Sequence, residues 1–237
     1  MTIPISDRLL ACAAYVNPGD RVADVGCDHG YLGIYLLKRN IARSIVASDL
    51  REGPLQSAED NAALFGVSDH MEFYLSDGVK NVPRDFDTLV CAGMGAETMI
   101  SILEAAPWLK DSCYRLILQC QIKTHLLRRY LTENGFRILE EKVLRDGKFL
   151  YTVLEARFLP GGGRLTPGQW YIPPVMLEAP DPDFPEYFFW VLGGIHKILA
   201  GRGETAPAFM VEAARELEIM AEHPVLKAYK EAQNESI

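Results

Sequence analysis

Long hydrophobic runs are absent from this 237-residue sequence. No apolar stretch approaches the ~20 residues that a membrane-spanning helix requires, and the first residues lack the basic and then apolar pattern of a secretory signal peptide. Hydrophobic residues nevertheless make up 49% of the chain, which is enough to form a sizeable core. We therefore expect a soluble, globular protein of the cytoplasm that does not have the membrane as a partner.

Cysteine is also scarce, and its spacing excludes two kinds of protein. The five cysteines are odd in number and scattered, and no two of them form a C-x-x-C pair. This pattern predicts neither a disulfide framework nor a zinc site, and no metal is expected. Free cysteine is mostly buried in proteins, so we predict that all five are small apolar core groups: Cys12, Cys27, Cys91, Cys113 and Cys120.

Positive charge is in deficit over the whole chain but not locally. The formal net charge of −8 argues against a protein that coats nucleic acid through bulk positive charge. Residues 115–148, however, contain eight Lys/Arg against four Asp/Glu. Two interpretations are open for this basic segment: a solvated helix face of mixed charge, or a local surface that contacts phosphates.

Neither of the common phosphate-binding motifs is present. The sequence has no G-x-x-x-x-G-K-[ST] segment, so kinase and NTPase functions have no anchor. Residues 23–32, Ala-Asp-Val-Gly-Cys-Asp-His-Gly-Tyr-Leu, follow a short apolar run and contain Gly26 and Gly30 with two carboxylates, Asp24 and Asp28. Asp28 stands where a dinucleotide fingerprint has its middle glycine, and its charge would repel a pyrophosphate.

Strand and helix patterns alternate through the first two thirds of the chain. We predict strands at 21–25, 44–49, 71–75, 86–92 and 115–118, with helices at 6–15 and 31–39 and further helices ending near residues 65, 103 and 131. Two adjacent strands, 136–144 and 149–158, follow as a hairpin. The alternation predicts an α/β fold, a Rossmann-like doubly wound sheet that is mostly parallel and has an antiparallel strand at one edge.

Four of these strand ends place polar groups or glycine at one crevice. Ligands bind outside the carboxyl ends of the strands in such sheets, where Asp24, Asp49, Asp77 and Gly93 are expected. An acidic crevice suits S-adenosylmethionine, which has a cationic sulfonium, an ammonium and ribose hydroxyls but no phosphate. Asp49 would accept from the ribose, and Asp77 would lie near the adenine. Each aspartate also has a local explanation, as a ligand of loop amides, a helix cap or part of a turn.

The composition changes after residue 158. Three consecutive glycines and seven prolines between 160 and 185 predict an irregular linker, and helical spacing returns at 186–200 and again up to about residue 222. Pro224 is expected to interrupt this second helix and leave a short helix at 225–232. Residues from 161 onward carry eleven Asp/Glu against six Lys/Arg, so two roles stay open for this part: limited contact with RNA, or packing on the first domain.

Several motifs together resemble one enzyme family. The run from Asp24 to Leu32, the Ala-Gly-Met-Gly of residues 92–95, the Leu-Ile-Leu-Gln of 116–119 and the Asp-Gly-Lys of 146–148 are similar to those of the bacterial tRNA (adenine-22-N1)-methyltransferases. The resemblance spans roughly residues 5 to 158. It implies an S-adenosyl-L-methionine-dependent methyltransferase domain at 1–160, a coiled-coil-like helical domain at 161–237, and methylation of N1 of an adenosine in the D-arm region of tRNA.

The expected site combines these inferences. Cofactor binding is assigned to the four glycine- or acid-containing strand ends: Asp24, Gly26, Cys27, Asp28, His29, Gly30, Tyr31, Asp49, Leu50, Asp77, Gly78, Gly93, Met94 and Gly95. Substrate binding is assigned to one amide and four cations: Gln119, Lys123, Arg128, Arg129 and Arg145. Asp28 and Met94 are the candidates for the reaction itself.

Methyl transfer from a sulfonium requires alignment and exclusion of water more than acid–base groups. Methylation of adenine N1 places positive charge on the base, which a carboxylate bonded to the exocyclic amine can stabilise. Asp28 is the candidate for that carboxylate, or else it holds the cofactor's amino group. Met94 either flanks the base or belongs to the core, and His29 orients the loop.

The chain departs from the usual family sequence at three places. Gly33 replaces proline, Ala96 replaces a third glycine, and Cys120-Gln121 replaces Pro-Asn. The last change would alter a loop that borders the target base. Two other functions therefore stay open: methylation of a small molecule or another RNA site, and a cofactor-binding module without catalysis.

Overall fold

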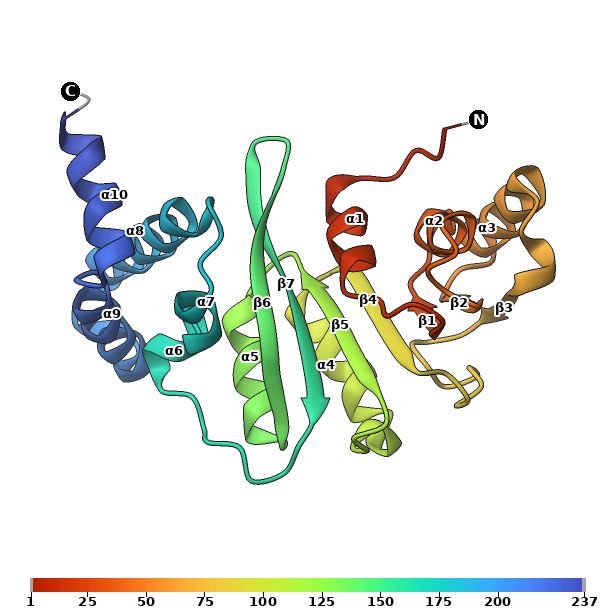
Figure 1. The fold of residues 1–237 in the computed structure, drawn as a ribbon. Helices are drawn as coiled ribbons and strands as arrows, with labels where there is room; N and C mark the ends of the chain where they lie inside the picture. Colours follow the sequence, from red (N-terminus) through yellow and green to blue (C-terminus); the bar gives the residue numbers. More distant parts are fainter. Residues whose placement is uncertain (1, 236–237) are drawn as a thin grey trace.

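A single seven-stranded sheet forms the centre of the molecule in the computed structural model, which describes residues 2–235 (Figure 1). The strand order is β3-β2-β1-β4-β5-β7-β6. The strands are β1 (Arg21–Val25), β2 (Ser44–Asp49), β3 (Met71–Leu75), β4 (Thr88–Met94), β5 (Arg115–Cys120), β6 (Phe136–Asp146) and β7 (Phe149–Phe158).

The first five strands are parallel, and the last two form an antiparallel hairpin. β7 pairs with β5 in antiparallel fashion, and β6 occupies the edge. A two-residue turn joins β6 to β7, so the hairpin partner has to run in the opposite direction, whereas parallel strands need a longer crossover, which contains a helix except between β3 and β4. The predicted α/β doubly wound fold with an antiparallel edge is confirmed.

Helices cover both faces of this sheet. The helices that belong to the first five strands are α1 (Asp7–Ala14), α2 (Tyr31–Lys38), α3 (Glu52–Phe65), α4 (Ala96–Glu104) and α5 (Thr124–Glu133). One core joins α1, α2 and α3 to strand residues such as Val22 and Ile45, and the other joins α4 and α5 to their neighbours Ala23 and Val46. Successive strand residues point to opposite faces, so strands buried on both sides are apolar throughout.

Five further helices lie beside the β6 edge, at the far end of the sheet from β3 (Figure 1). They are α6 (Pro167–Tyr171), α7 (Pro174–Glu178), α8 (Phe184–Arg202), α9 (Ala208–Met220) and α10 (Pro224–Glu235). Phe184 and Phe188 of α8 share a buried cluster with Ala213 and Leu217 of α9 and with Val143 of β6. Within residues 2–235, no helix is long and apolar enough to cross a membrane.

The helices α6 and α7 correct the prediction of an irregular segment between residues 160 and 185. Thr166 caps α6: its side chain accepts from the Gln169 N–H, and the Gln169 side chain accepts from the Thr166 N–H. Proline follows each cap, at a position where its missing N–H costs nothing. The prolines that indicated a linker instead begin two short helices.

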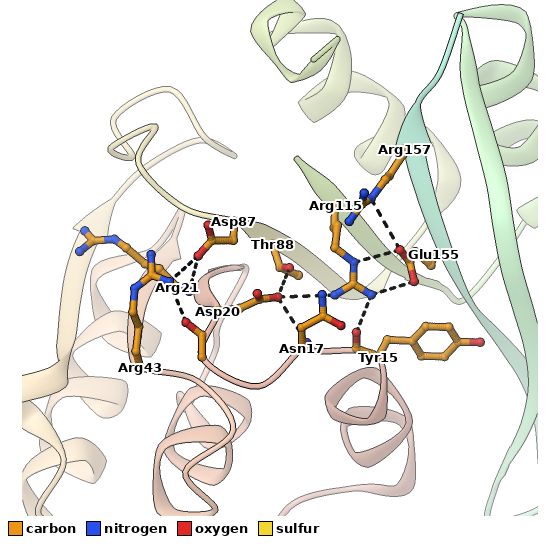
Figure 2. Close-up of polar contacts among 11 residues, drawn as sticks. Tyr15, Asn17, Asp20, Arg21, Arg43, Asp87, Thr88, Arg115, Glu155 and Arg157 are labelled. Carbon is orange, nitrogen blue, oxygen red and sulfur yellow. Dashed lines mark hydrogen bonds and ion pairs between the residues drawn. The ribbon is translucent and has the colours of Figure 1, made fainter. Parts of the chain in front are cut away.

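A buried polar network fastens the sheet at the amino ends of its strands (Figure 2). The Arg115 guanidinium donates to both carboxylate oxygens of Glu155 at 2.8 and 2.9 Å and to the carbonyl of Tyr15 at 2.9 Å, and it lies 3.5 Å from Asp20. Only 7% of Arg115 is exposed. Arg115 therefore cannot belong to a phosphate-contacting surface, because its guanidinium is buried and paired with Glu155 on the neighbouring strand β7.

Four of the five cysteines are buried and unpaired, as predicted. Cys113 is the exception, because it lies exposed in the loop before β5. The backbone N–H of Cys113 donates to the Asp111 carboxylate at 2.9 Å. The preference of free cysteine for burial did not apply here, because Cys113 lies in a surface loop that does not pack into the core.

Candidate functional site

The loop after β1 bends back onto the end of β2. The N–H groups of Gly26 and Cys27 both donate to the carbonyl of Ser48, at 2.8 and 2.9 Å. The N–H of Asp28 donates to the Asp49 carboxylate at 3.3 Å. Gly26 and Asp28 have positive φ angles of 73° and 50°, so both lie in the left-handed region that favours glycine and tolerates aspartate.

Gly26 has a second reason to lack a side chain. A Cβ at this position would lie 2.2 Å from the terminal methyl of Met94, at the end of β4. Met94 is half-buried and packs against the core beneath α4 and α5. The Met94 side chain packs on the loop and also lines the cavity described next, so its contact with the target base stays a prediction.

A cavity of about 820 Å³ opens at the carboxyl ends of the parallel strands. Its volume lies within the range of small-molecule sites, which is about 300–1,000 Å³. Eleven of the residues assigned from sequence line it: Asp24, Gly26, Cys27, Asp28, Asp49, Leu50, Asp77, Gly78, Gly93, Met94 and Gln119. The three acidic strand ends thus meet in one concave surface, as the doubly wound topology predicts.

Asp24 is a buried carboxylate with unused hydrogen-bonding capacity. The residue is 4% exposed, and its Oδ2 has no hydrogen-bonding partner among the described residues. Burial raises the pKa of Asp24 to about 7, and the nearby charge of Asp49 acts in the same direction. The hydrogen bond that the Gly33 N–H donates to Asp24 opposes this rise. Gly33 stands where the family usually has proline, which has no N–H to donate. An unpartnered carboxylate oxygen at a cavity wall is suited to a cationic or hydrogen-donating ligand.

Asp49 and Asp77 differ in how firmly they are held. The Asp49 carboxylate is 9% exposed and accepts from the Arg51 N–H at 3.0 Å as well as from Asp28. The Asp77 side chain is 60% exposed and forms an ion pair with Lys80, one turn later. Asp49 therefore organises the loop after β1, while the Asp77 carboxylate stays at the rim.

The strand β4 ends in a bulge that brings bare backbone to the cavity. The pairing of β4 with β5 shifts between Ala92 and Met94, and the Gly93 between them has a φ of 78°. The Gly93 N–H donates to Oε1 of Gln119 at 3.0 Å, so the buried amide of β5 fixes the bulge. Bulges of this kind redirect side chains next to binding sites.

Four of the residues assigned to cofactor binding lie outside the cavity lining: His29, Gly30, Tyr31 and Gly95. Gly30 caps α2 with a φ of 72°, and a Cβ there would be 3.0 Å from Ala58 of α3, so this glycine lets two helices approach. The rings of His29 and Tyr31 lie 5.7 Å apart, and the His29 carbonyl accepts from Asn61. Gly95 is the N-cap of α4. These residues shape the loop and its helices rather than the cavity surface.

The predicted substrate-binding cations have unequal positions. Arg128 is 1% exposed: it donates to both oxygens of Glu141 and to the carbonyls of Trp170 and Tyr171. The prediction that Arg128 contacts phosphate is therefore wrong, because a buried guanidinium must be paired. This bond set joins α5 to β6 and α6. The partner Glu141 lies 13 residues further along the chain, in β6, a separation that no local spacing rule detects.

The other three cations remain at the surface, each beside a carboxylate. Lys123 pairs with Glu97 of α4 at 2.7 Å, and Arg129 pairs with Glu133 at 3.0 Å. Arg145, near the tip of the β6–β7 hairpin, pairs with two acidic residues at the start of α8, Asp183 at 2.8 Å and Glu186 at 2.7 Å. Each side chain is between 39% and 50% exposed.

The sequence predicted the helices α1 and α4 but not that both line the cavity. The N-cap and first turn of α1 contribute Ser6, Arg8 and Leu9, and the first two turns of α4 contribute Glu97, Thr98, Ser101 and Ile102. For α4 a signal was available, since a helix that follows a strand end at Gly95 begins at the crevice. For α1 there was none. Nε of Arg8 lies 2.5 Å from the Asp146 carboxylate, and its guanidinium lies over the Tyr151 ring, so tertiary packing places it.

The cavity fits S-adenosylmethionine in two respects. Glycines at 26 and 93 expose the backbone where a side chain would fill the space, and the unpartnered Oδ2 of Asp24 is an acceptor for an ammonium. Burial raises the pKa of the Cys27 thiol, so this cysteine of the loop after β1 is uncharged where it lines the cavity. The fold and site together define a Rossmann-like methyltransferase.

Comparison with known proteins agrees with this class. The methyltransferase domain family matches residues 5–154, and the chain belongs to it. The tRNA (adenine(22)-N(1))-methyltransferase of Bacillus subtilis is 30% identical over 155 residues, a match that spans 65% of this chain and 65% of that protein. The resemblance to the bacterial tRNA (adenine-22-N1)-methyltransferases is thus confirmed.

Solved structures extend the likeness to the C-terminal helices. The crystal structure of the B. subtilis enzyme, TrmK, has a TM-score of 0.77 at 25% identity and covers 96% of this chain and 99% of that one. Sp1610 of Streptococcus pneumoniae, in complex with S-adenosyl-L-methionine, has a TM-score of 0.79 at 27% identity and covers 90% and 98%. The five helices beside the β6 edge are therefore part of the shared fold.

Proposed function

We propose that this protein transfers a methyl group from S-adenosyl-L-methionine to N1 of an adenosine in tRNA, at position 22 as in its relatives. The acidic, glycine-walled cavity at the strand ends carries the proposal, because it excludes phosphate-bearing cofactors and suits a cationic one. Residues 1–160 bind the cofactor, and residues 161–237 form the helical domain. A tRNA substrate would be met in the cytoplasm.

Three aspartates divide the recognition of the cofactor. Asp24 accepts from the ammonium through the oxygen that has no partner within the protein. Asp49, which is already fixed by two backbone N–H groups, has remaining lone pairs for the ribose hydroxyls. Asp77 and Gly78 lie at the end where the adenine would be bound. Bound S-adenosyl-L-methionine supplies an activated methyl group on its sulfonium.

We infer that Asp28 acts on the target base. Its side chain is 63% exposed and lines the cavity, and its nearest ionic contact among residues 2–235 is His29, whose Nε2 is 3.7 Å away. A carboxylate that accepts from the exocyclic amine stabilises the positive charge that methylation brings to the ring. Gly93 and Met94 line the same cavity, and the absence of a side chain at Gly93 leaves backbone against which a base extruded from its helix can lie.

The variant Asp28→Asn separates the two roles open to this residue. Asparagine tolerates the left-handed backbone at this position, whereas alanine would add strain. A catalytic role predicts that kcat falls by roughly 10²-fold or more, while the Kd for S-adenosyl-L-methionine changes less than twofold. A large rise in that Kd with kcat unchanged would instead assign Asp28 to cofactor binding alone.

The function is tested by incubating the purified protein with labelled S-adenosyl-L-methionine and total tRNA, then digesting the tRNA and identifying the modified nucleoside. The expected product is 1-methyladenosine from one position. Label at N6 of adenosine, or at another site, would contradict the regiochemistry. Cofactor binding with no labelled RNA would leave the small-molecule and non-catalytic functions in its place.

A further inference from the structure

A second cavity lies beside the first, between the start of α5, the strand β7 and the helix α8. Its volume is about 380 Å³. Its walls are mainly aromatic and aliphatic, and they include Tyr151, Tyr171, Tyr187 and Trp190. Trp190 is 66% exposed, and Ile122 and Ile198 of the same walls are also exposed, so the cavity opens on an apolar patch of the surface.

Two polar groups in these walls are suited to the edge of a planar ligand. Tyr171 is only 8% exposed, and its Oη is buried and has no hydrogen-bonding partner among the described residues. The Tyr171 ring stacks on His125 at a centroid distance of 4.5 Å. Burial, with the charges of Arg128 and Lys123, lowers the pKa of His125 to about 4, so its ring is neutral at pH 7 and presents one donor and one acceptor.

The two cavities are connected by shared and paired residues. Gln121 lines both of them, and its Nε2 would lie 3.6 Å from a Cβ at Gly93. Lys123 of the second cavity forms an ion pair with Glu97 of the first. The separation between the two sites is therefore about one side chain thick.

Cations stand at this boundary. Lys123 is half-exposed on one side, and Arg8 lies over the ring of Tyr151 on the other. Each of these two cations is paired with a carboxylate, and a phosphate that approaches from the solvent can compete with that carboxylate for the cation. The cofactor cavity and the aromatic cavity, with cations between them, match two successive nucleotides and the phosphate that joins them.

We propose that the second cavity binds an unstacked nucleobase of the RNA substrate, adjacent in the strand to the adenosine that enters the cofactor cavity. This inference rests on the proposed tRNA methyltransferase function. The base lies against Trp190 and Tyr151 and accepts a hydrogen bond from Oη of Tyr171. The residues Cys120 and Gln121, which replace the Pro-Asn of the family, line this cavity and adapt it in this chain.

The test uses tRNA transcripts with 2-aminopurine on either side of the methylated adenosine. We expect the fluorescence of one of the two probes to fall on binding wild-type protein, because a base stacked on an aromatic ring is quenched. Trp190→Ala should abolish that change and raise the KM for tRNA by about tenfold, with kcat and cofactor affinity changed less than twofold. Tyr171→Phe keeps the ring and should raise the same KM by a smaller factor.

Ile219→Ala is the matched control, since Ile219 is 75% exposed on α9 and lines neither cavity. A wild-type enzyme that methylates tRNA, together with a Trp190→Ala variant whose KM is unchanged, overturns the nucleobase site alone. Failure of the wild type to methylate any tRNA overturns the proposed function and the site with it. A dimer that Trp190→Ala dissociates in sedimentation would show that a second copy covers the cavity, which also overturns the proposal.

Discussion

Replacing Asp24 by asparagine should stabilise the free protein and weaken its cofactor binding. Burial of this carboxylate raises its pKa from 3.8 to about 7. Between these two pH values the folded protein retains a proton that the unfolded chain has released, so stability falls as the pH rises through this window. Each pH unit corresponds to about 1.4 kcal/mol, which gives a cost of about 4 kcal/mol at pH 8.

Asparagine cannot ionise, but its buried amide leaves new polar atoms without partners, at a cost of about 1–3 kcal/mol. We therefore expect the free energy of unfolding of Asp24→Asn to exceed that of the wild type by about 1–3 kcal/mol at pH 8, and to show no gain at pH 4. Urea unfolding at the two pH values measures this difference. A variant that is less stable than the wild type at pH 8 would refute the argument from burial.

Cofactor binding should respond in the opposite direction. Hydrogen bonds to charged groups contribute about 1.5–3 kcal/mol, so Asp24→Asn should weaken the affinity for S-adenosyl-L-methionine by roughly 10- to 100-fold. A cationic ligand favours the ionised carboxylate, so wild-type affinity should rise between pH 6 and pH 8 and binding should release a proton. Titration calorimetry in two buffers of different ionisation enthalpy measures that proton. Equal affinity in the variant, or no pH dependence in the wild type, would refute the assignment.

Three further predictions concern other parts of the fold. Arg128→Ala should lower the free energy of unfolding by about 3–5 kcal/mol, because it leaves a buried carboxylate unpaired, whereas the half-exposed Arg129→Ala should cost under about 1 kcal/mol; equal urea midpoints would contradict this. Gly26→Ala should raise the Kd for S-adenosyl-L-methionine, since the new methyl meets a methionine side chain and the backbone has a φ of 73°; an unchanged titration would be evidence against it. Asp146→Asn should weaken the ion pair of Arg8 at the cavity wall and lower the KM for tRNA severalfold, with kcat retained, because an RNA phosphate then meets no competing carboxylate; a raised KM would contradict that role.

The cofactor end of the site was accessible from sequence because of a topological rule. Parallel strands direct their carboxyl ends to one edge, so an acidic or glycine residue that ends each strand needs no further information to be placed. Asp24, Asp49 and Asp77 meet at the cavity for this reason. The left-handed glycines followed from the same local logic, because backbone requirements are local.

The basic segment misled because charge in a sequence does not state exposure. Arg115 and Arg128 contribute to the positive charge of the segment just as Lys123 and Arg145 do, yet Arg115 and Arg128 are buried in ion pairs. Their partners lie 40 and 13 residues further along the chain, at Glu155 and in β6. Pairings of this kind depend on strand register.

The sequence alone determined the parallel sheet, its hairpin edge, the strand-end cluster of carboxylates and the family resemblance, because these depend on residue periodicity and on local turn chemistry. Only the tertiary structure decided which cations reach the solvent, that α1 brings Arg8 to the cavity, and that an aromatic cavity adjoins it. The physical reason is distance along the chain. Burial and pairing arise from contacts between segments far apart in sequence, such as α5 with α6 and β6, and no short pattern records them.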